Sequence, residues 1–303
     1  MTNQETRRHA SQGQVRPSET AEITCAQRAG ESLRPPDRRL INDQYAKNFV
    51  TKPLRRALVA NRFMARVTLS VFDAKFPGFM AIVLLRNRWY EDTLATCVAE
   101  GIPQVVMLGA GYDTTAWRLN LGDATLFEVD AAPTQTAKRA TMESRGLRPT
   151  GRLQYVPCDF ERDSLPDQLA AHGFDTDAPS LFVWYGVSFF LSAEAVGQTM
   201  RDVAALAAPG SRFVWDYLDP AVVDGTSHYR GAMKARAAVA TRGEPYTFGL
   251  TPDSAERIMR RHGFCVEANV SMTDLAQRYS GSRGFPYSTD DFFGIVTGRR
   301  ESR

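Results

Sequence analysis

The hydrophobic positions divide the chain into two regions with different periods. Between Glu19 and about Gly101, apolar residues recur three and four positions apart, as in LRRALVANRFMARVTLSVF. That spacing is typical of amphipathic helices. Pro53 suits a first helical position, and Pro77-Gly78 interrupts the pattern. Because no comparable strand pattern precedes residue 104, residues 19–101 are predicted to form a helical cap segment.

After this segment, short apolar runs alternate with helical stretches. The runs predict strands at 104–110, 125–131, 153–160, within 180–190 and at 211–218. Helices are predicted after Gly111, with Asp113 or Thr114 as the cap, and over 134–145 and 194–208. Strands that alternate with helices favour a parallel sheet covered on both faces.

The C-terminal third completes the predicted sheet. Residues 219–250 are rich in glycine and charge and are predicted to be an irregular insertion. A helix is expected from Thr251 as cap, with Pro252 at its first position and Gly263 as its stop. Strands at 265–271 and 292–300, joined by a non-helical connection, predict an antiparallel pair at one edge. The result is an open, seven-stranded, mostly parallel α/β sheet with an antiparallel edge strand.

These patterns predict one structural domain with three parts. Residues 1–18 lack the apolar side chains needed to offset the entropy of ordering, so a disordered tail is predicted there. The helical cap follows over 19–101. The α/β core occupies 102–303, and its insertion at 219–250 is expected to contribute to substrate binding as a lid.

Composition narrows the class of protein. Of 303 residues, 43% are hydrophobic and 23% charged, which is ordinary for a globular chain. The net charge is +3, and the basic residues are not interleaved with aromatic ones, which argues against nucleic-acid binding. The longest apolar run, FMAIVLL at 79–85, is far shorter than the roughly 20 residues of a membrane span. We therefore expect a soluble, cytoplasmic protein.

Metal chemistry is not expected. The four cysteines form no CxxC pair, and the four histidines form no HExxH motif.

The stretch VVMLGAGYDTTAWRL, residues 105–119, contains the first candidate site. A buried strand ends at the turn Gly109-Ala110-Gly111. In open α/β sheets, ligands bind beyond the carboxyl ends of the strands, near the point where the strand order reverses. The third glycine of a dinucleotide fingerprint would stand at Thr114, so the nicotinamide interpretation is weakened. A tight turn without a ligand remains the alternative for this motif alone.

Acidic residues at the next two strand ends favour a ligand. Asp130 follows Gly111 by nineteen residues, a position from which a carboxylate can accept both hydrogen bonds of a ribose diol. Glu128 lies on the same side of the strand, but Asp130 is nearer the carboxyl end. A helix cap is the alternative role for Asp130. Asp159 and Phe160 can bind an exocyclic amine and pack on a purine. Together these features fit S-adenosylmethionine, an adenosyl cofactor without a pyrophosphate.

With these residues described, the chain resembles the leucine carboxyl methyltransferase family, in particular its bacterial branch of small-molecule methyltransferases. The resemblance covers roughly residues 20–300 and implies a class I methyltransferase-like fold. It is carried by NDQYAKNF (42–49), LLRNRWYED (84–92), VVMLGAGYDTTAWRL (105–119), FEVDAAPTQTAK (127–138), YVPCDF (155–160), FVWYGVSFFL (182–191) and SRFVWDYL (211–218).

The resemblance also implies roles for individual residues. Arg86 would hold the cofactor carboxylate, which a guanidinium can pair with bidentately. Arg28 lies in a helical segment that covers the active site in the family and is therefore a candidate for the cofactor site. The alternative is that Arg28 is a surface arginine without such a role. The other implied contacts are Gly109, Ala110 and Gly111 with the methionine moiety, Asp130 with the ribose, and Asp159 and Phe160 with the adenine.

One departure from the family pattern concerns the fourth strand. The family usually carries Glu in a WEGV-like segment, whereas this chain has Tyr185 in Trp184-Tyr185-Gly186-Val187. Phe190 stands where the family often has Tyr. Loss of the carboxylate either weakens cofactor binding or reflects recruitment of Tyr185 for the acceptor. A tolerated substitution is the third interpretation.

The predicted reaction is methyl transfer to an oxygen by in-line displacement. A carboxylate acceptor is already ionised at neutral pH and needs no general base, whereas a hydroxyl would be helped by one. No histidine stands at a strand end, which favours a carboxylate of a small-molecule metabolite over a hydroxyl. A protein carboxyl terminus is a variant of the same hypothesis. The candidates for acceptor positioning are Tyr185, Tyr217, His228 and Tyr229, with Arg230 and Tyr246 as further contributors.

Two other functional classes remain open from the sequence. The glycine turn also fits a nicotinamide-dependent oxidoreductase. The Tyr185 departure also fits a non-catalytic adenosyl-binding protein. The acceptor's identity and the oligomeric state are not predicted.

Overall fold

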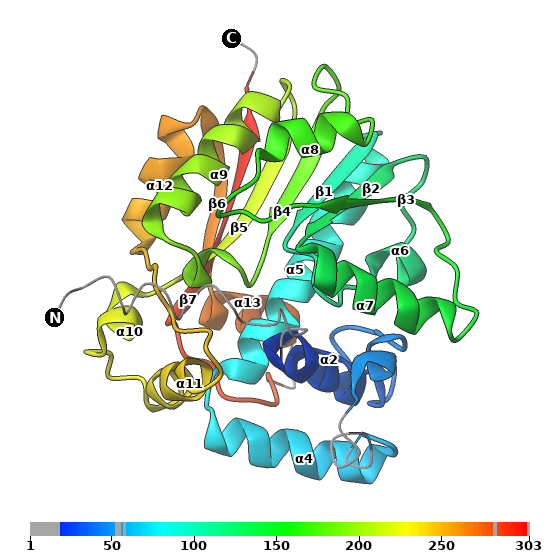
Figure 1. Cartoon of the computed structure of the whole chain (residues 1–303). Coiled ribbons are helices and arrows are strands. Elements are labelled where there is room, and N and C mark those ends of the chain that lie inside the picture. Colours follow the sequence, from blue (N-terminus) through cyan, green and yellow to red (C-terminus); the bar gives the residue numbers. More distant parts are fainter. Residues whose placement is uncertain (1–18, 52–55, 57–58, 281–283, 302–303) are drawn as a thin grey trace, which may run out of the picture.

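A twisted sheet runs through the centre of the molecule, with helices on both of its faces (Figure 1). The computed structural model describes residues 19–51, 56, 59–280 and 284–301, so the tail 1–18 and the predicted helix start at Pro53 lie outside the described residues. In this part the sheet has seven strands in the order β3-β2-β1-β4-β5-β7-β6. They are β1 (Gln104–Leu108), β2 (Thr125–Asp130), β3 (Arg152–Pro157), β4 (Ser180–Trp184), β5 (Arg212–Leu218), β6 (Phe264–Ser271) and β7 (Phe293–Arg300).

The predicted sheet is confirmed, with one correction. Strands β1 to β5 are parallel, and β7 runs antiparallel to both β5 and β6. The prediction of a non-helical connection between the last two strands was wrong, because α13 (Met272–Ser280) follows β6 directly. Met272, Leu275 and Ala276 form a buried stripe on this helix. Its short length, just before a polar stretch, concealed that periodicity in the sequence.

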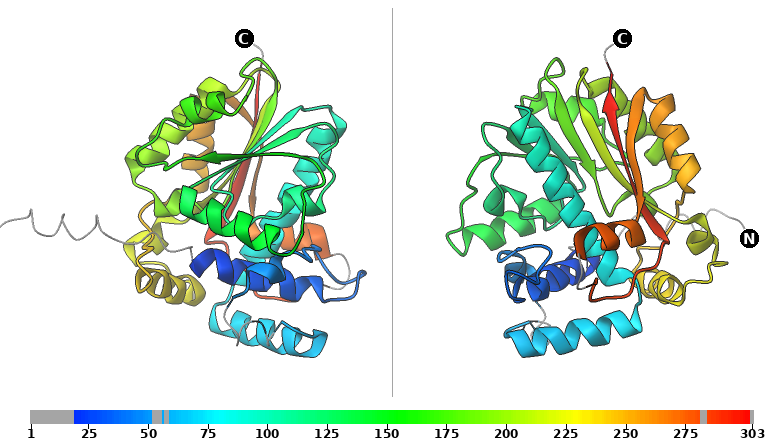
Figure 2. Two further views of the ribbon diagram at one scale, coloured as in Figure 1. Left: turned by 45° about the vertical axis from the view of Figure 1, so that its right-hand side comes forward. Right: turned by 180° about the vertical axis from the view of Figure 1, so that it is seen from behind.

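Two layers of helices enclose the sheet. On one face pack α5 (Phe79–Ala99) and the smaller helices α6 (Thr115–Arg118) and α7 (Ala132–Glu143), as the rear view of Figure 2 shows for α5. The other face is covered by α8 (Leu165–Ala171), α9 (Ala193–Leu206) and α12 (Pro252–Arg261). Because both faces are buried, β1 and β4 are almost entirely apolar in sequence, and β5 is apolar except for Arg212 and Asp216.

At several of the predicted helix ends, the structure shows the expected capping contact or break. Thr251 caps α12 by accepting the backbone N–H of Ser254, and Pro252 is its first residue. Pro77-Gly78 separates α4 (Arg62–Lys75) from α5, and Gly78 adopts a left-handed conformation with φ of 85°. Thr114 precedes α6, while the Asp113 carboxylate accepts the N–H of Thr115.

A third group of helices lies across the carboxyl ends of the parallel strands (Figure 1). It contains α2 (Glu19–Ser32) and α4 from the predicted cap segment, with the short 3-10 helix η1 (Ala46–Phe49) beside them. Residues 219–250 were predicted to be irregular, but they contain α10 (Pro220–Asp224) and α11 (Arg230–Ala240). The many alanines of α11 favour a helix because alanine has the highest helix propensity. Ala232 and Ala235 are buried on one side of this helix together with Val239.

No single helix among the described residues is long and apolar enough to cross a membrane. The helices α4 and α5 pass that test only when taken as a pair, and they meet at a bend of 112°.

Candidate functional site

A cleft of about 450 Å³ opens at the carboxyl ends of β1, β2 and β4, where the strand order reverses. This is the position at which open α/β sheets bind their ligands. The structure brings all the predicted cofactor residues to this cleft. Those that line it are Arg28, Arg86, Gly109, Ala110, Gly111, Asp130, Asp159, Phe160 and Tyr185.

The backbone of the glycine turn is left-handed at both glycines, and it packs too closely at Gly109 to allow a side chain. Gly109 and Gly111 have φ of 72° and 49°, a region that disfavours side chains. A Cβ atom on Gly109 would lie 2.2 Å from Cγ2 of Val187, so no other residue fits there without a shift. At Gly111, by contrast, the nearest atom to an added Cβ is 3.9 Å away. The space over Gly111 is therefore open toward the cleft.

Asp130 fixes the glycine turn from the end of β2. Its Oδ2 accepts the N–H of Gly111 at 2.5 Å, and its Oδ1 accepts the N–H of Ala131 at 2.7 Å. Burial raises the pKa of Asp130, and these two backbone donors oppose the rise. The carboxylate thus fixes the glycine turn and borders the cleft, whereas the N-cap of α7 is Ala131 and not Asp130.

Glu128 lies deeper on the same side of β2 and does not reach the cleft. Its Oε2 lies 2.6 Å from Nζ of Lys138, and both side chains are buried. Burial raises the pKa of Glu128 to about 7, against the lowering effect of Lys138. The pair therefore supports the sheet beneath the site.

Asp159 and Phe160 also line the cleft and follow β3 in the chain. The Oδ1 atom of Asp159 accepts the N–H of Glu161 at 3.0 Å, while the side chain stays half-exposed. Its other oxygen has only a long contact of 3.7 Å with Arg162. This carboxylate can accept a hydrogen bond from a ligand without breaking a buried contact.

Arg86 reaches the cleft from α5 and is held there by a residue that the sequence reasoning missed. Nη1 of Arg86 lies 2.9 Å from Oδ2 of Asp216, which is only 1% exposed. The N–H of Gly186 donates to Oδ1 of the same carboxylate at 2.9 Å. An acid inside the buried strand sequence FVWDYL was the available signal, because a charge in such a strand needs a partner.

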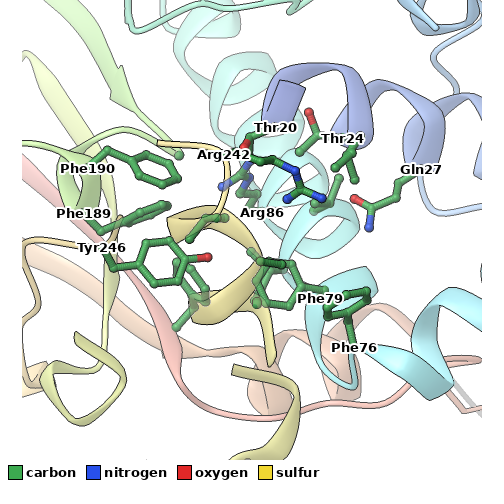
Figure 3. A pocket seen from close by; sticks show the side chains of 18 of the residues that line it. Thr20, Thr24, Gln27, Phe76, Phe79, Arg86, Phe189, Phe190, Arg242 and Tyr246 are labelled. Carbon is green, nitrogen blue, oxygen red and sulfur yellow. The ribbon is translucent and has the colours of Figure 1, made fainter. Parts of the chain in front are cut away.

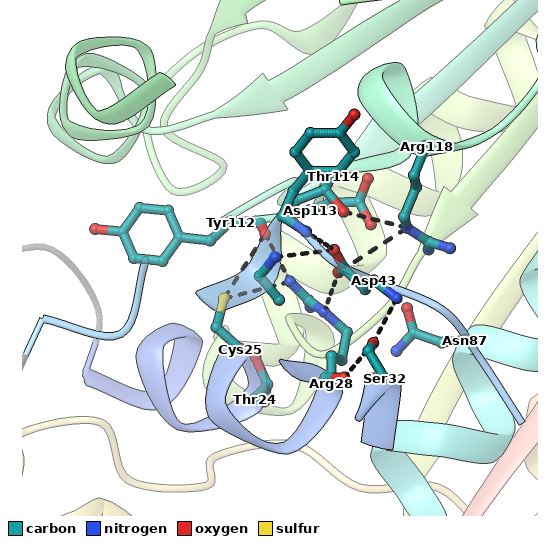
Figure 4. A network of polar contacts seen from close by, with 12 residues as sticks. Thr24, Cys25, Arg28, Ser32, Asp43, Asn87, Tyr112, Asp113, Thr114 and Arg118 are labelled. Atoms are coloured by element: carbon teal, nitrogen blue, oxygen red, sulfur yellow. Dashed lines mark hydrogen bonds and ion pairs between the residues drawn. The ribbon is translucent and has the colours of Figure 1, made fainter. Parts of the chain in front are cut away.

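Arg28 is buried rather than a surface residue, with 6% of its area exposed. Figure 4 shows its side chain extending from α2 toward Asp43 and Tyr112. Nε pairs with Oδ2 of Asp43 at 2.9 Å, and Nη2 donates to the carbonyl of Tyr112 at 2.7 Å. Asp43 also accepts the N–H of Ala46. Arg28 therefore ties the helical cap to the cofactor turn.

Tyr185 lines the cleft and has a buried hydroxyl group with no hydrogen-bond partner among the described residues. Its ring lies edge-on to that of Tyr90, with the centroids 6.4 Å apart. Burial raises the pKa of Tyr185 well above 10, so the phenol stays protonated. It supplies a neutral donor where the family pattern has a carboxylate.

Most of the predicted acceptor residues lie elsewhere. Tyr217 donates to Oδ1 of Asn269 at 2.7 Å and lines a separate cavity, because strand alternation places it on the opposite face of β5 from Asp216. His228 and Tyr229 have ring centroids 4.0 Å apart, and Tyr229 packs on Phe292. Arg230 is exposed. None of these four lines the cleft.

A second, smaller hollow of about 90 Å³ adjoins the cleft and is called the aromatic chamber below (Figure 3). Thr20, Thr24, Arg86, Gly186 and Phe190 line both spaces, so they mark the junction. The predicted contributor Tyr246 lies here. The other lining residues are Ile23, Gln27, Phe72, Phe76, Phe79, Ile82, Val83, Phe189, Ala235, Ala238, Val239, Arg242 and Phe293.

The chamber is assembled from segments far apart in the chain. Phe72 comes from α4, Phe76 directly follows that helix, Phe79 comes from α5, and Ala235 comes from α11. At the mouth, the Thr20 hydroxyl donates to Oε2 of Glu244 at 2.5 Å, which joins α2 to the insertion 219–250. The walls of the chamber therefore combine residues of the helical cap with residues of the insertion.

The model of the leucine carboxyl methyltransferase family matches residues 21–204. The chain belongs to this family. It is an S-adenosylmethionine-dependent methyltransferase, and the oxidoreductase and non-catalytic alternatives are set aside. The methyltransferase is 32% identical over 225 residues to a candidate S-adenosyl-L-methionine-dependent methyltransferase of Mycolicibacterium vanbaalenii, with 71% of each chain covered. A relative of the same description from Mycolicibacterium gilvum is 34% identical over 227 residues, covering 72% of this chain and 69% of its own.

Solved structures share the fold of this methyltransferase at lower identity. A candidate methyltransferase from Thermobifida fusca aligns over 95% of this chain and all of its own, with a TM-score of 0.58 and 17% identity. A DUF574 family protein from Streptomyces avermitilis aligns over 91% of this chain and 97% of its own, with a TM-score of 0.60 and 15% identity. The class I methyltransferase fold predicted from the sequence is thus confirmed.

Proposed function

We propose that this methyltransferase esterifies a carboxylate of a small, apolar metabolite. The observation that carries the proposal is the aromatic chamber, which opens onto the cofactor cleft beside Arg86 and Gly186. Its walls are apolar and largely aromatic, as suits a ring or short hydrocarbon.

The cleft residues fit S-adenosylmethionine. Asp130 would accept from the ribose hydroxyls, and Asp159 with Phe160 would hold the adenine. The open space over Gly111 would take the methionine chain, since a Cβ there has no neighbour closer than 3.9 Å. Arg86 would share its guanidinium between Asp216 and the cofactor carboxylate, which its fork of donors permits. When bound, the cofactor supplies the methyl group of its sulfonium.

The chemistry of the chamber favours an acceptor that is already charged. The described residues that line it include no Asp, Glu or His, so no ordinary general base touches the space. Burial raises the pKa of Tyr246, and its hydroxyl stays protonated at neutral pH. A carboxylate needs no proton removed, because its ordinary pKa lies near 4. A hydroxyl acceptor would have to lose its proton without help.

Hydrogen-bond donors and the exclusion of water are the contributions of the protein. Arg86 and Arg242 both line the chamber and offer N–H donors to an anionic acceptor, while Asp216 offsets the charge of Arg86. The surrounding phenylalanines keep water away from the reacting oxygen. The protein would hold the acceptor oxygen in line with the methyl group, so that the reaction no longer depends on a bimolecular encounter. Such positioning can lower the activation barrier by several kcal/mol. The small volume of the chamber favours a metabolite over a protein tail.

The first test is titration calorimetry with S-adenosylmethionine and S-adenosylhomocysteine. Methyl transfer is then measured on matched carboxylic acids and phenols between pH 6 and pH 9. We expect binding of both cofactor forms and esters as products, at a rate that does not change with pH. Exclusive methylation of phenols, at a rate that rises with pH, would show a hydroxyl acceptor instead. Failure to bind either cofactor form would overturn the assignment of the cleft.

A further inference from the structure

The aromatic chamber contains one buried polar side chain whose amide is satisfied by none of the described residues. Gln27 on α2 is 3% exposed, and neither Oε1 nor Nε2 of its amide has a hydrogen-bond partner among the described residues. Figure 3 shows the amide extending from α2 into the space beside Phe76 and Phe79. Leaving a buried amide unpaired costs about 1–3 kcal/mol. An apolar residue of similar size would avoid that cost, so the amide is expected to have a partner in the functional complex.

The place of Gln27 on α2 gives the direction in which a bound molecule would extend. Thr20, Thr24 and Gln27 are separated by four and three residues, so they share one face of the helix. Thr20 and Thr24 line both the cofactor cleft and the chamber, whereas Gln27 lines the chamber alone. Seven residues of α-helix rise roughly 10 Å. Gln27 therefore marks the end of the chamber remote from the cleft.

We infer that the acceptor is a compact ring-bearing carboxylic acid with a hydroxyl or carbonyl group at the end remote from its carboxylate, and that Gln27 selects it by hydrogen bonding to that group. The inference rests on the proposed function, because it takes the chamber as the acceptor site. An amide both donates and accepts, so a hydroxyl or a carbonyl can satisfy it. The chamber, at about 90 Å³, is smaller than an engineered cavity of roughly 150 Å³ that holds benzene, so the acceptor has at most one ring, and part of the molecule with its carboxylate lies in the adjoining cleft of about 450 Å³.

A buried amide such as that of Gln27 can discriminate strongly between acids that carry a hydrogen-bonding group and acids that lack it. A site that hydrogen-bonds a substrate hydroxyl rejects the analogue that lacks it, because the partner in the site is then left unpaired. Gln27 is a specificity residue in this inference and takes no part in the methyl transfer. Its replacement should change which acids are accepted and leave the binding of the cofactor intact.

The test compares two matched pairs of acids. They are para-hydroxyphenylacetate with phenylacetate, and para-hydroxybenzoate with benzoate. Binding to the complex with S-adenosylhomocysteine is measured by calorimetry, and kcat/KM is measured with S-adenosylmethionine. The variants are Gln27→Leu and, as a control that changes the shape of the same wall without removing a polar group, Ile23→Leu.

In the wild type we expect at least a tenfold preference for the hydroxylated acid of at least one pair. In Gln27→Leu the preference should fall to within about twofold, mainly through weaker binding of the hydroxylated acid. Ile23→Leu should keep the preference. Gln27→Leu should also melt at the same or a higher temperature than wild type, because the unpaired amide is gone.

Three results would overturn the inference. They are no preference in the wild type, a preference that survives in Gln27→Leu, and a marked loss of stability in that variant, which would show a structural role for the amide. Binding of none of the four acids to a complex that does bind S-adenosylhomocysteine would overturn the acceptor class. Methylation of other carboxylates would then leave the proposed function standing, whereas absence of cofactor binding would remove it.

Discussion

The guanidinium of Arg86 lies 2.9 Å from the buried carboxylate of Asp216 at the junction between the cofactor cleft and the aromatic chamber. Gly186, with φ of 77°, donates its N–H to the same carboxylate, and a Cβ on it would come within 3.1 Å of both terminal nitrogens of Arg86. One ion pair thus joins α5, β5 and the loop after β4. The stability of this junction and its capacity to bind ligands depend on the same two side chains.

Removing one member of this pair should cost more than removing both. In Arg86→Ala, Asp216 is left without its cationic partner, and we expect the free energy of unfolding to fall by about 3–5 kcal/mol. In Arg86→Leu/Asp216→Asn, the unpaired charge is absent and most of that loss should be recovered. Affinity for S-adenosylhomocysteine should stay at least tenfold weaker in both. Urea denaturation and calorimetry separate the two effects, and recovery of affinity in the double variant would exclude Arg86 from the cofactor site.

The cost of Arg86→Ala should depend on pH. Burial raises the pKa of Asp216, and Arg86 and the N–H of Gly186 oppose that rise, so loss of Arg86 raises the pKa further. The folded state then binds more protons than the unfolded state, and stability falls as pH rises through the window above the ordinary value of 3.8. We expect Arg86→Ala to differ less from wild type at pH 4 than at pH 7. Denaturation curves with the same offset at both pH values would contradict this.

The glycine turn should tolerate no side chain at its first position. In Gly109→Ala the new Cβ would lie 2.2 Å from Cγ2 of Val187, on a backbone with φ of 72°. Gly101→Ala is the matched control, since φ is 78° there and no atom lies within 4 Å of the added Cβ. The control should lose about 1–2 kcal/mol of unfolding free energy from strain alone. Gly109→Ala should lose clearly more and should also lose affinity for S-adenosylhomocysteine, and equal losses would show that the contact with Val187 relaxes freely.

The sheet and the cofactor cleft were predictable because their signals are local. Gly109 and Asp130 stand at the ends of apolar runs, and parallel strands bring such ends to one edge. The helix α11 was missed because its alanines and charges carry little hydrophobic contrast. The antiparallel pair was found, although the connecting helix α13 was too short to show a clear period.

The acceptor side of the site could not be predicted from local patterns. Phe76, Phe189 and Tyr246 come together only through tertiary packing of segments that are widely separated in sequence. Asp216 looked like one acid in a strand, and nothing local identified Arg86 as its partner. Gln27 resembled any polar residue on an amphipathic helix, since only the packed structure shows that its amide is buried and unpaired.

Asp130 should control the affinity for the cofactor. If it accepts from the ribose hydroxyls, Asp130→Asn should weaken binding of S-adenosylhomocysteine by about 10–100-fold, because charge-assisted hydrogen bonds are lost. In wild type, affinity should fall as pH decreases toward the pKa of Asp130, which burial raises above 3.8. The Asn variant should lack this dependence. Asp123→Asn, at an exposed position, is the control, and an unchanged acid dependence in Asp130→Asn would assign that titration to another group.

Tyr185 offers a test of what replaced the family carboxylate. Tyr185 lines the cleft, and its hydroxyl is buried with no partner among the described residues, so Tyr185→Phe should leave the free energy of unfolding unchanged or slightly higher. We expect affinity for S-adenosylhomocysteine to fall about tenfold, as for a lost neutral hydrogen bond. Tyr90→Phe is the matched control, because the hydroxyl of Tyr90 is also buried but Tyr90 does not line the cleft.

The pattern of kinetic constants in Tyr185→Phe separates the three interpretations of the departure. Weaker cofactor binding with an unchanged KM for the acceptor places the hydroxyl on the cofactor, as expected here. An unchanged cofactor affinity with a higher acceptor KM would place it on the acceptor instead. Wild-type values for both would show a tolerated substitution. Because the raised pKa of Tyr185 keeps the phenol protonated, none of these differences should vary between pH 6 and pH 9.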